Sequence, residues 1–156
     1  DPDQFRVGGL AFVYVDEDRD RALREFEQPC VWYFRNFTKL IPANKFPANE
    51  SYYISLHELL SNTLAAYDRG EVSFEWIVTK SPFAHAFLVG DPAYVADKLQ
   101  RLTTMYGGLS DVLCWTRLGG LDHHKVMRSM QLLLEKVVMP ARARLAHGSN
   151  PVRRRA

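Results

Sequence analysis

Three short apolar runs, each followed by a pattern of helical spacing, divide this chain of 156 residues. The runs lie at residues 10–15, 86–89 and 111–116 and consist largely of residues that favour strands. Continuous apolar runs of this length are typical of strands buried in a parallel sheet. The alternation of strand and helix therefore predicts an α/β fold with right-handed crossover connections.

The helix expected after the third strand carries the clearest signals. Gly119 and Gly120 form a loop, Asp122 stands where it can cap the helix amino terminus, and Pro140 is expected to end the helix. Apolar residues recur at helical spacing between these points, so one face of the helix should pack on a core. They are Val126, Met130, Leu133, Leu134 and Val137.

The helix expected after the second strand shows similar signals. Asp91 is placed to cap it, and Pro92 suits its first position. Gly107 suits a left-handed cap at its carboxyl end. The expected buried face consists of Val95, Leu99, Leu102 and Tyr106.

The connection between the first two strands is long and aromatic. Acidic residues at 16–20 favour the start of a helix, which Pro29 is expected to kink or break. A second helix is expected from about 53 to 69, with Gly70 at its end. The alternation of apolar and polar residues over 72–78 suggests a further strand.

We assign residues 1–147 to one α/β unit with an insertion at about 42–85, and residues 148–156 to a polar, basic tail. Three parallel strands cannot close a barrel, and an open sheet leaves two unpaired edges. The chain is therefore either a small sheet with covered edges or the last part of a larger fold. A TIM (β/α)8 barrel takes about 250 residues, and three of its units with an insertion fit the present length.

The composition, 47% hydrophobic and 24% charged, is that of an ordinary globular protein. A net charge of +2 gives no strong field, so we expect no nucleic-acid partner. No apolar run is long enough to span a bilayer and no secretory signal is seen, so we expect no membrane association. Cys30 and Cys114 form no disulfide framework, Cys114 lies in an expected buried strand, and a cytoplasmic location fits best.

Three segments resemble the luciferase-like family of flavin-dependent monooxygenases, the group of bacterial luciferase. Residues 89–99 (VGDPAYVADKL) resemble the family segment VGxPxxVAxxL, which opens the seventh helix. Residues 108–113 resemble the start of its eighth strand. Residues 117–132, followed by Val138-Met139-Pro140, resemble its last helix. The order and spacing of the three segments together indicate the family.

The resemblance is strong over 86–140 and thinner over 10–40. It implies the C-terminal part of a TIM barrel that binds FMN at the carboxyl ends of its strands. Members of the family use O2 and reduced FMN, supplied by a flavin reductase, to oxygenate a small organic substrate such as an aldehyde, a sulfonate, a ketone or an alkane. The family's phosphate-binding residues would precede Asp1, so this segment alone is expected to be inactive.

Two alternative functions follow from the same resemblance. One is a non-catalytic barrel subunit that supports a partner chain in a homo- or hetero-oligomer. The other is an oxidoreductase that uses a deazaflavin in place of FMN. The sequence contains no GxSxG, P-loop or GxGxxG motif in support of a hydrolase, a nucleoside triphosphatase or a classical dinucleotide fold.

Candidate site residues lie where the strands end, because function gathers there in barrels. Trp115 and Arg117 share a strand face by alternation. Trp115 is either a pocket wall or core, and Arg117 either meets an anion or forms a structural salt bridge. Gly119 and Gly120 either let the backbone approach a ring or simply turn the chain. His85 is either a proton donor or a hydrogen-bonded structural residue.

His123 and His124 do not share a helix face and have no partner at ligand spacing, so we expect no metal site. A dense aromatic group either lines an apolar substrate channel or packs within the insertion or at a dimer surface. It consists of Trp32, Tyr33, Phe34, Phe37, Phe46, Tyr52 and Tyr53.

Overall fold

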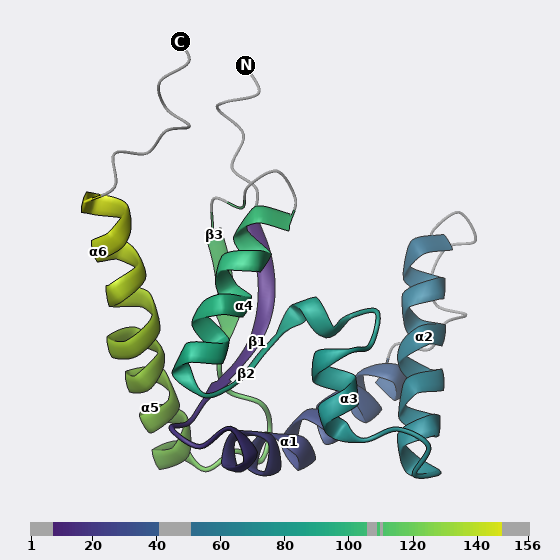
Figure 1. Cartoon of the computed structure of the whole chain (residues 1–156). Coiled ribbons are helices and arrows are strands. Elements are labelled where there is room, and N and C mark those ends of the chain that lie inside the picture. Colours follow the sequence, from purple (N-terminus) through teal and green to yellow (C-terminus); the bar gives the residue numbers. More distant parts are fainter. Residues whose placement is uncertain (1–7, 41–50, 106–108, 110, 148–156) are drawn as a thin grey trace.

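A computed structural model describes residues 8–40, 51–105, 109 and 111–147. The described part is an α/β structure, mostly helical, with a three-stranded parallel sheet (Figure 1). The strands are β1 (Gly8–Val15), β2 (Phe87–Gly90) and β3 (Asp111–Trp115). The predicted α/β class and the three predicted strands are therefore confirmed.

The strand order is β2-β1-β3, with both pairings parallel. Three successive units of a barrel wall would instead place the second strand in the middle. The physical reason for the observed order lies in β1, where every residue from Ala11 to Val15 is buried. A strand that is apolar on both faces needs neighbours on both edges and cover on both sides, so it takes the centre of the sheet.

Helices surround the sheet on both faces and at one end (Figure 1). Helix α1 crosses the end of the sheet where β1 finishes, and α2 and α3 stand beside it. The helical elements are α1 (Arg19–Leu40), α2 (Ser51–Asp68), α3 (Phe74–Thr79), the short 3-10 turn η3 (Ala84–Ala86), α4 (Pro92–Met105), α5 (His123–Leu132), the π-helical segment η4 (Leu133–Val138) and α6 (Met139–His147). None of the described helices is long and apolar enough to cross a membrane.

Alternation along β1 divides the interior into two cores. Phe12 and Tyr14 face α1, α2 and α3. Ala11, Val13 and Val15 face α4 and η4 on the opposite side of the sheet. The second core buries Leu133 and Val137, as the apolar stripe predicted, whereas Met130 and Leu134 of the same stripe are exposed.

Local capping signals are confirmed where the structure describes them. The Asp91 carboxylate accepts a hydrogen bond from the Tyr94 N–H at 2.9 Å, and Pro92 is the first residue of α4. The Asp122 carboxylate accepts bonds from the N–H groups of His124 and Lys125. Val95 and Leu102 are buried as predicted. Tyr106, Gly107 and the tail at 148–156 lie outside the described residues.

The strand predicted at 72–78 is wrong, because Phe74–Thr79 form helix α3. Ser73 caps this helix, its hydroxyl accepting a hydrogen bond from the Trp76 N–H at 3.1 Å. The buried residues Phe74, Ile77 and Val78 have the spacing of a helix face. The Ser73 cap and the buried face of α3 favour a helix more strongly than the alternation of apolar and polar residues favours a strand.

Pro29 does not break its helix, and Pro140 does not end its helix as predicted. Helix α1 continues through Pro29 to Leu40, because Phe26, Cys30 and Val31 around the proline are all buried and hold the turn in place. Pro140 lies inside a continuous helical path, directly after the π-helical segment η4, where the regular pattern of backbone hydrogen bonds is already changed. The helical path therefore runs from His123 to His147.

The third strand is less buried than predicted. It occupies an edge of the sheet, Leu113 is 70% exposed, and Cys114 is exposed rather than part of a core. An edge strand has only one neighbour, so its outer backbone groups and many of its side chains face outward. Among the residues that the structure describes, no strand pairs with the outer edge of β3.

Candidate functional site

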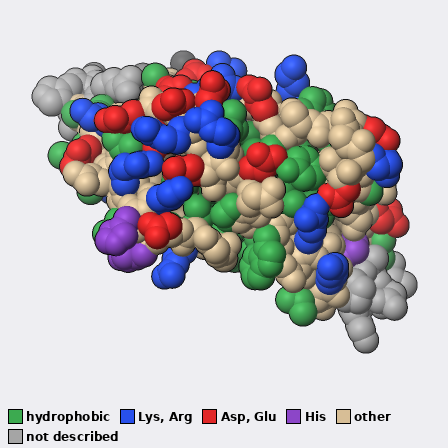
Figure 2. All heavy atoms as spheres, turned by 90° about the horizontal axis from the view of Figure 1, so that it is seen from below, with side chains coloured by type: hydrophobic (Ala, Val, Ile, Leu, Met, Phe, Trp, Pro, Cys, Tyr) green, Lys and Arg blue, Asp and Glu red, His purple; other side chains and the backbone are tan. Residues whose placement is uncertain are grey.

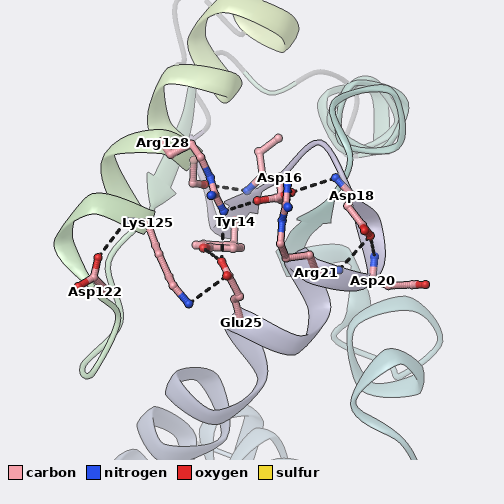
Figure 3. Close-up of polar contacts among 11 residues, drawn as sticks. Tyr14, Asp16, Asp18, Asp20, Arg21, Glu25, Asp122, Lys125 and Arg128 are labelled. Atoms are coloured by element: carbon pink, nitrogen blue, oxygen red, sulfur yellow. Dashed lines mark hydrogen bonds and ion pairs between the residues drawn. The ribbon is translucent and has the colours of Figure 1, made fainter.

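A cluster of charged residues lies where β1 ends, the position at which parallel α/β sheets carry their sites (Figure 3). Tyr14 and Asp16 come from β1 and the residue after it. Arg21 and Glu25 come from α1, and Lys125 and Arg128 come from α5. The cluster therefore joins three elements that are distant in sequence.

Asp16 is the centre of this cluster and is completely buried. Its carboxylate accepts hydrogen bonds from Arg21 Nε at 2.7 Å and from the Asp18 N–H at 2.9 Å, and it also binds the Arg128 guanidinium. Burial is the largest single influence and opposes ionisation, but these hydrogen bonds and the arginine charges together outweigh it. They hold the pKa of Asp16 below its usual range.

Tyr14 and Glu25 form the second half of the cluster. The Tyr14 hydroxyl donates to Glu25 Oε2 at 2.5 Å, and Lys125 Nζ lies 2.9 Å from Glu25 Oε1. Burial, followed by the neighbouring carboxylate, raises the pKa of Tyr14. Burial opposes ionisation of Glu25, but the bonds from Tyr14 and Lys125 keep its pKa below the usual range. Tyr14 is therefore a neutral donor to an ionised carboxylate.

The cluster holds three cations against two carboxylates, and each cation is paired with a carboxylate. Arg21 and Arg128 bind Asp16, and Lys125 binds Glu25. Figure 2, which views the molecule from this end, shows acidic and basic side chains lying side by side over much of the face. We conclude that the cluster ties α1 and α5 to the end of β1.

Sequence reasoning did not find this cluster. The acids at 16–20 were expected to act as charges at a helix start, and Asp18 does so by accepting bonds from the N–H groups of Asp20 and Arg21. Asp16 has a different role because it continues the buried strand. Its partner Arg128 is 112 positions away, and no local pattern signals that pairing.

An apolar cavity of about 660 Å³ lies on the α1 side of the sheet. It is enclosed by residues of β1, β2, α1, α2 and the segment before β2. The lining residues are Leu10, Phe12, Tyr33, Phe34, Phe37, Ser55, Leu56, Leu59, Leu60, Pro82, Phe83, His85, Ala86 and Phe87. A cavity of this size and character is typical of a small-molecule site.

The structure places two predicted site residues at this cavity or beside it. His85, in η3, lines it directly. Trp115 is in register with Phe12, and their rings stack with centroids 5.6 Å apart. Trp115 also meets the Tyr33 ring at 5.2 Å, so it backs the aromatic wall while remaining 39% exposed.

Part of the predicted aromatic group belongs to the same wall. Tyr33, Phe34 and Phe37 of α1 line the cavity, whereas Trp32 is 56% exposed. Burial raises the pKa of Tyr33, which keeps its phenol neutral. Phe46 and the side chains of Tyr52 and Tyr53 lie outside the described residues. The catalytic or binding roles of all these residues stay predictions.

Arg117, Gly119 and Gly120 lie outside the cavity lining. Arg117 is exposed, and its carbonyl oxygen accepts the Trp115 Nε1–H bond at 2.9 Å. A Cβ on Gly119 would lie 2.6 Å from the Trp32 ring, so this glycine permits a close approach to an aromatic side chain. Gly120 has a φ of 88° and turns the chain.

A second cavity of about 300 Å³ lies on the other side of His85. Lys98 lines it, donates a hydrogen bond from Nζ to the Val78 carbonyl at 2.7 Å, and lies near the Tyr94 ring. Burial, aided by the nearby Arg19 charge, lowers the pKa of Lys98 to about 8. His123 and His124 are exposed on α5, and no group of three or more metal-ligating side chains occurs in the part of the chain searched.

FMN requires cations or N–H donors for its phosphate as well as a surface for its ring. The ring requirement is met by the aromatic cavity. Among the side chains that the structure describes, no arginine or lysine lines that cavity, and Arg21, Arg128 and Lys125 are engaged by carboxylates. No arginine or lysine side chain that the structure describes therefore stands in the lining of this cavity to meet the phosphate of FMN.

Comparison with known proteins gives no assignment, since no protein-family model matches this sequence and no curated protein matches it.

Proposed function

We propose that this chain is the C-terminal part of a luciferase-like, flavin-dependent monooxygenase, which uses reduced FMN and O2 to oxygenate a small organic substrate. In this proposal the chain supplies part of the substrate cavity and little of the FMN site. A flavin reductase, a cytoplasmic location and assembly with the same or another chain belong to the same proposal.

The observation that carries the proposal is the order and spacing of the three family-like segments. Residues 89–99 span the end of β2 and the start of α4, with Asp91 as the cap. The second segment leads into β3, and residues 117–132 lead into α5 with Asp122 as its cap. Each segment thus lies at the start or end of a strand or helix, whereas β1 separates the two strands, β2 and β3, that the resemblance would make neighbours in a barrel.

The apolar cavity gives independent support for an organic substrate. Six aromatic rings and several leucines surround it. Such apolar walls suit the apolar part of an organic substrate. The cavity lies against the aromatic row formed by Phe87, Phe12 and Trp115, whose rings are in register across the three strands.

The TIM barrel is proposed from the resemblance and has a structural test. A barrel has no free edge, so β3 must pair on its outer side with a further parallel strand. Within the described part of the chain no strand pairs with that edge, and Leu113 is 70% exposed. A structure of the complete protein in which β3 gains no parallel neighbour would contradict the barrel.

The function is tested on the protein purified from its source. Its intact mass shows whether further chain precedes these residues, and its absorption spectrum shows whether flavin is bound. The proposal expects a longer chain that consumes O2 with reduced FMN in the presence of an organic substrate. A protein without flavin binding or oxygen consumption would instead be the non-catalytic subunit, and preference for a reduced deazaflavin would identify the other oxidoreductase.

Arg117 is tested in that same complete protein by substitution with alanine. If it meets an anion of cofactor or substrate, turnover falls while the melting temperature is unchanged. Unchanged turnover at saturating substrate, together with a lower melting temperature, would show that the residue is structural.

A further inference from the structure

The cavity of about 300 Å³ beside His85 is built mainly by one face of α4. Tyr94, Lys98 and Arg101 line it from that face, and Thr79 at the end of α3 also lines it. Residues three or four positions apart share one side of a helix, so the aromatic ring and the two cations reach the same space. The function proposed above makes no use of this cavity.

Two ion pairs stand around the cavity. The Arg19 guanidinium lies 4.7 Å from the centre of the Tyr94 ring and pairs with Glu75 at 2.9 Å. Arg101 pairs with Asp97, one turn away on the same helix, at 2.8 Å. Each of these pairs cancels its own charge.

Lys98 is the third cation and belongs to neither pair. Its ammonium donates a hydrogen bond to the Val78 carbonyl at 2.7 Å and lies 5.6 Å from the centre of the Tyr94 ring. An ammonium group has three N–H donors, so two remain for a ligand. Burial and the charge of Arg19 both oppose the charged form and lower the pKa of Lys98 to about 8. An anion at the ammonium would offset both effects.

The lining also limits the charge and the body of that anion. The Asp97 carboxylate lines the cavity and repels a second negative charge, so a single carboxylate suits the site better than a phosphate dianion. Ala84, Leu102 and Met105 supply apolar surface, which favours a ligand with a short hydrocarbon part. Burial raises the pKa of Tyr94, so its phenol stays neutral and can donate a hydrogen bond.

We propose that this cavity binds a small organic monocarboxylate, whose carboxylate pairs with the Lys98 ammonium and whose hydrocarbon part lies against Leu102 and Met105. The proposal goes beyond the monooxygenase function and does not depend on it, because it rests on a second cavity and on the charges around that cavity. Its test needs no flavin.

Butyrate tests the proposal on the complete protein, with butyramide as its uncharged counterpart and phosphate as the dianion. Lysine labelled with ¹³C at Cε gives an NMR signal for Lys98, which is identified by its loss in Lys98→Arg. We expect butyrate to shift this signal and to raise the pKa of Lys98 above about 8. Butyramide and phosphate should bind at least about tenfold more weakly. No shift with butyrate, or equal binding of either other compound, would overturn the proposal.

The pH dependence of binding separates a pair with Lys98 from other contacts. Butyrate stays ionised at neutral and alkaline pH, whereas Lys98 has a pKa of about 8, so the affinity should fall about tenfold from about pH 7 to about pH 9. Lys98→Arg keeps its charge throughout and should show no such fall. The other charged or titratable groups at or beside the cavity are Arg19, Glu75, His85, Tyr94, Asp97 and Arg101. A fall that persists in Lys98→Arg would assign it to one of these groups and overturn the proposal.

Three substitutions show whether the anion lies at this cavity. Lys98→Met should weaken butyrate binding about tenfold at pH 7. Lys80→Met is the matched control, because Lys80 is an exposed lysine directly after α3 and lies outside the cavity lining. Asp97→Asn, at an exposed position, should strengthen binding about twofold by removing a repelling charge. Unchanged binding in Lys98→Met, an equal loss in Lys80→Met, or weaker binding in Asp97→Asn would contradict the proposal.

Discussion

Substitution of the buried carboxylate at the end of β1 gives the sharpest test of the polar cluster. Asp16→Asn keeps the size of the side chain and removes its charge. The carboxylate is fully buried and accepts bonds from Arg21, the Asp18 N–H and Arg128. Hydrogen bonds to charged groups contribute about 1.5–3 kcal/mol each, and breaking a fully buried ion pair costs about 3–5 kcal/mol.

The expected loss is smaller than that upper figure. The Arg21 and Arg128 side chains are 41% and 46% exposed, so water can replace part of what they lose. The asparagine oxygen can also keep the bond from the Asp18 N–H. We therefore expect the free energy of unfolding to fall by about 2–3 kcal/mol near neutral pH.

The same substitution predicts a dependence on pH. The pKa of Asp16 is lowered on folding, from an ordinary value of about 3.9 in the unfolded chain. Its stabilising contribution is therefore complete above the unfolded pKa and is lost as the pH falls through the lower, folded value. The difference between wild type and Asp16→Asn should be constant above about pH 5 and should shrink below about pH 4.

Urea unfolding followed by circular dichroism measures both effects. Asp20→Asn is the matched control, because Asp20 is an exposed acid at the start of α1. A loss below about 0.5 kcal/mol for Asp16→Asn, the range typical of surface sites, would refute the reasoning. So would a loss equal to that of the control, or a difference that persists unchanged at low pH.

Three further predictions concern the packing of the helices and loops and the buried amine of Lys98. Leu133→Ala should lower the free energy of unfolding by about 2–5 kcal/mol, because Leu133 is buried. Leu134→Ala should lower it by less than about 0.5 kcal/mol, because Leu134 is exposed. Similar urea midpoints for the two variants would contradict this packing. Gly119→Ala should lower the free energy of unfolding by about 1–3 kcal/mol, because the added methyl group would contact the Trp32 ring. A double-mutant cycle tests this, since most of the loss should disappear when Trp32 is also replaced by alanine. The pKa of Lys98 is lowered to about 8, below about 10.4 in the unfolded chain, so the unfolded state binds more protons between these values. The stability of wild type relative to Lys98→Met should therefore rise with pH across this window, and a difference independent of pH would show that the lysine titrates normally.

The sequence by itself determined the three strands and the caps of the helices that follow β2 and β3, because these depend on neighbours along the chain. The strands at 8–15, 87–90 and 111–115 are found from continuous apolar runs. Caps such as Asp91 and Asp122 bind backbone groups only two or three residues away, so their roles can be predicted from the local sequence. The same local reasoning failed for α3, where alternation and helical spacing overlap in six residues.

Only the tertiary structure decided which strand is central, what Asp16 binds and which residues form the cavity. Each of these depends on contacts between segments far apart in sequence, as in the pairing of Asp16 with Arg128 across 112 positions. His85 and the aromatic residues of α1 were identified separately as candidates, and folding brings them to one cavity beside Trp115. Strand β1 is apolar on both faces, and both faces need cover, so β1 occupies the centre of the sheet. Strand β3 therefore lies at an edge.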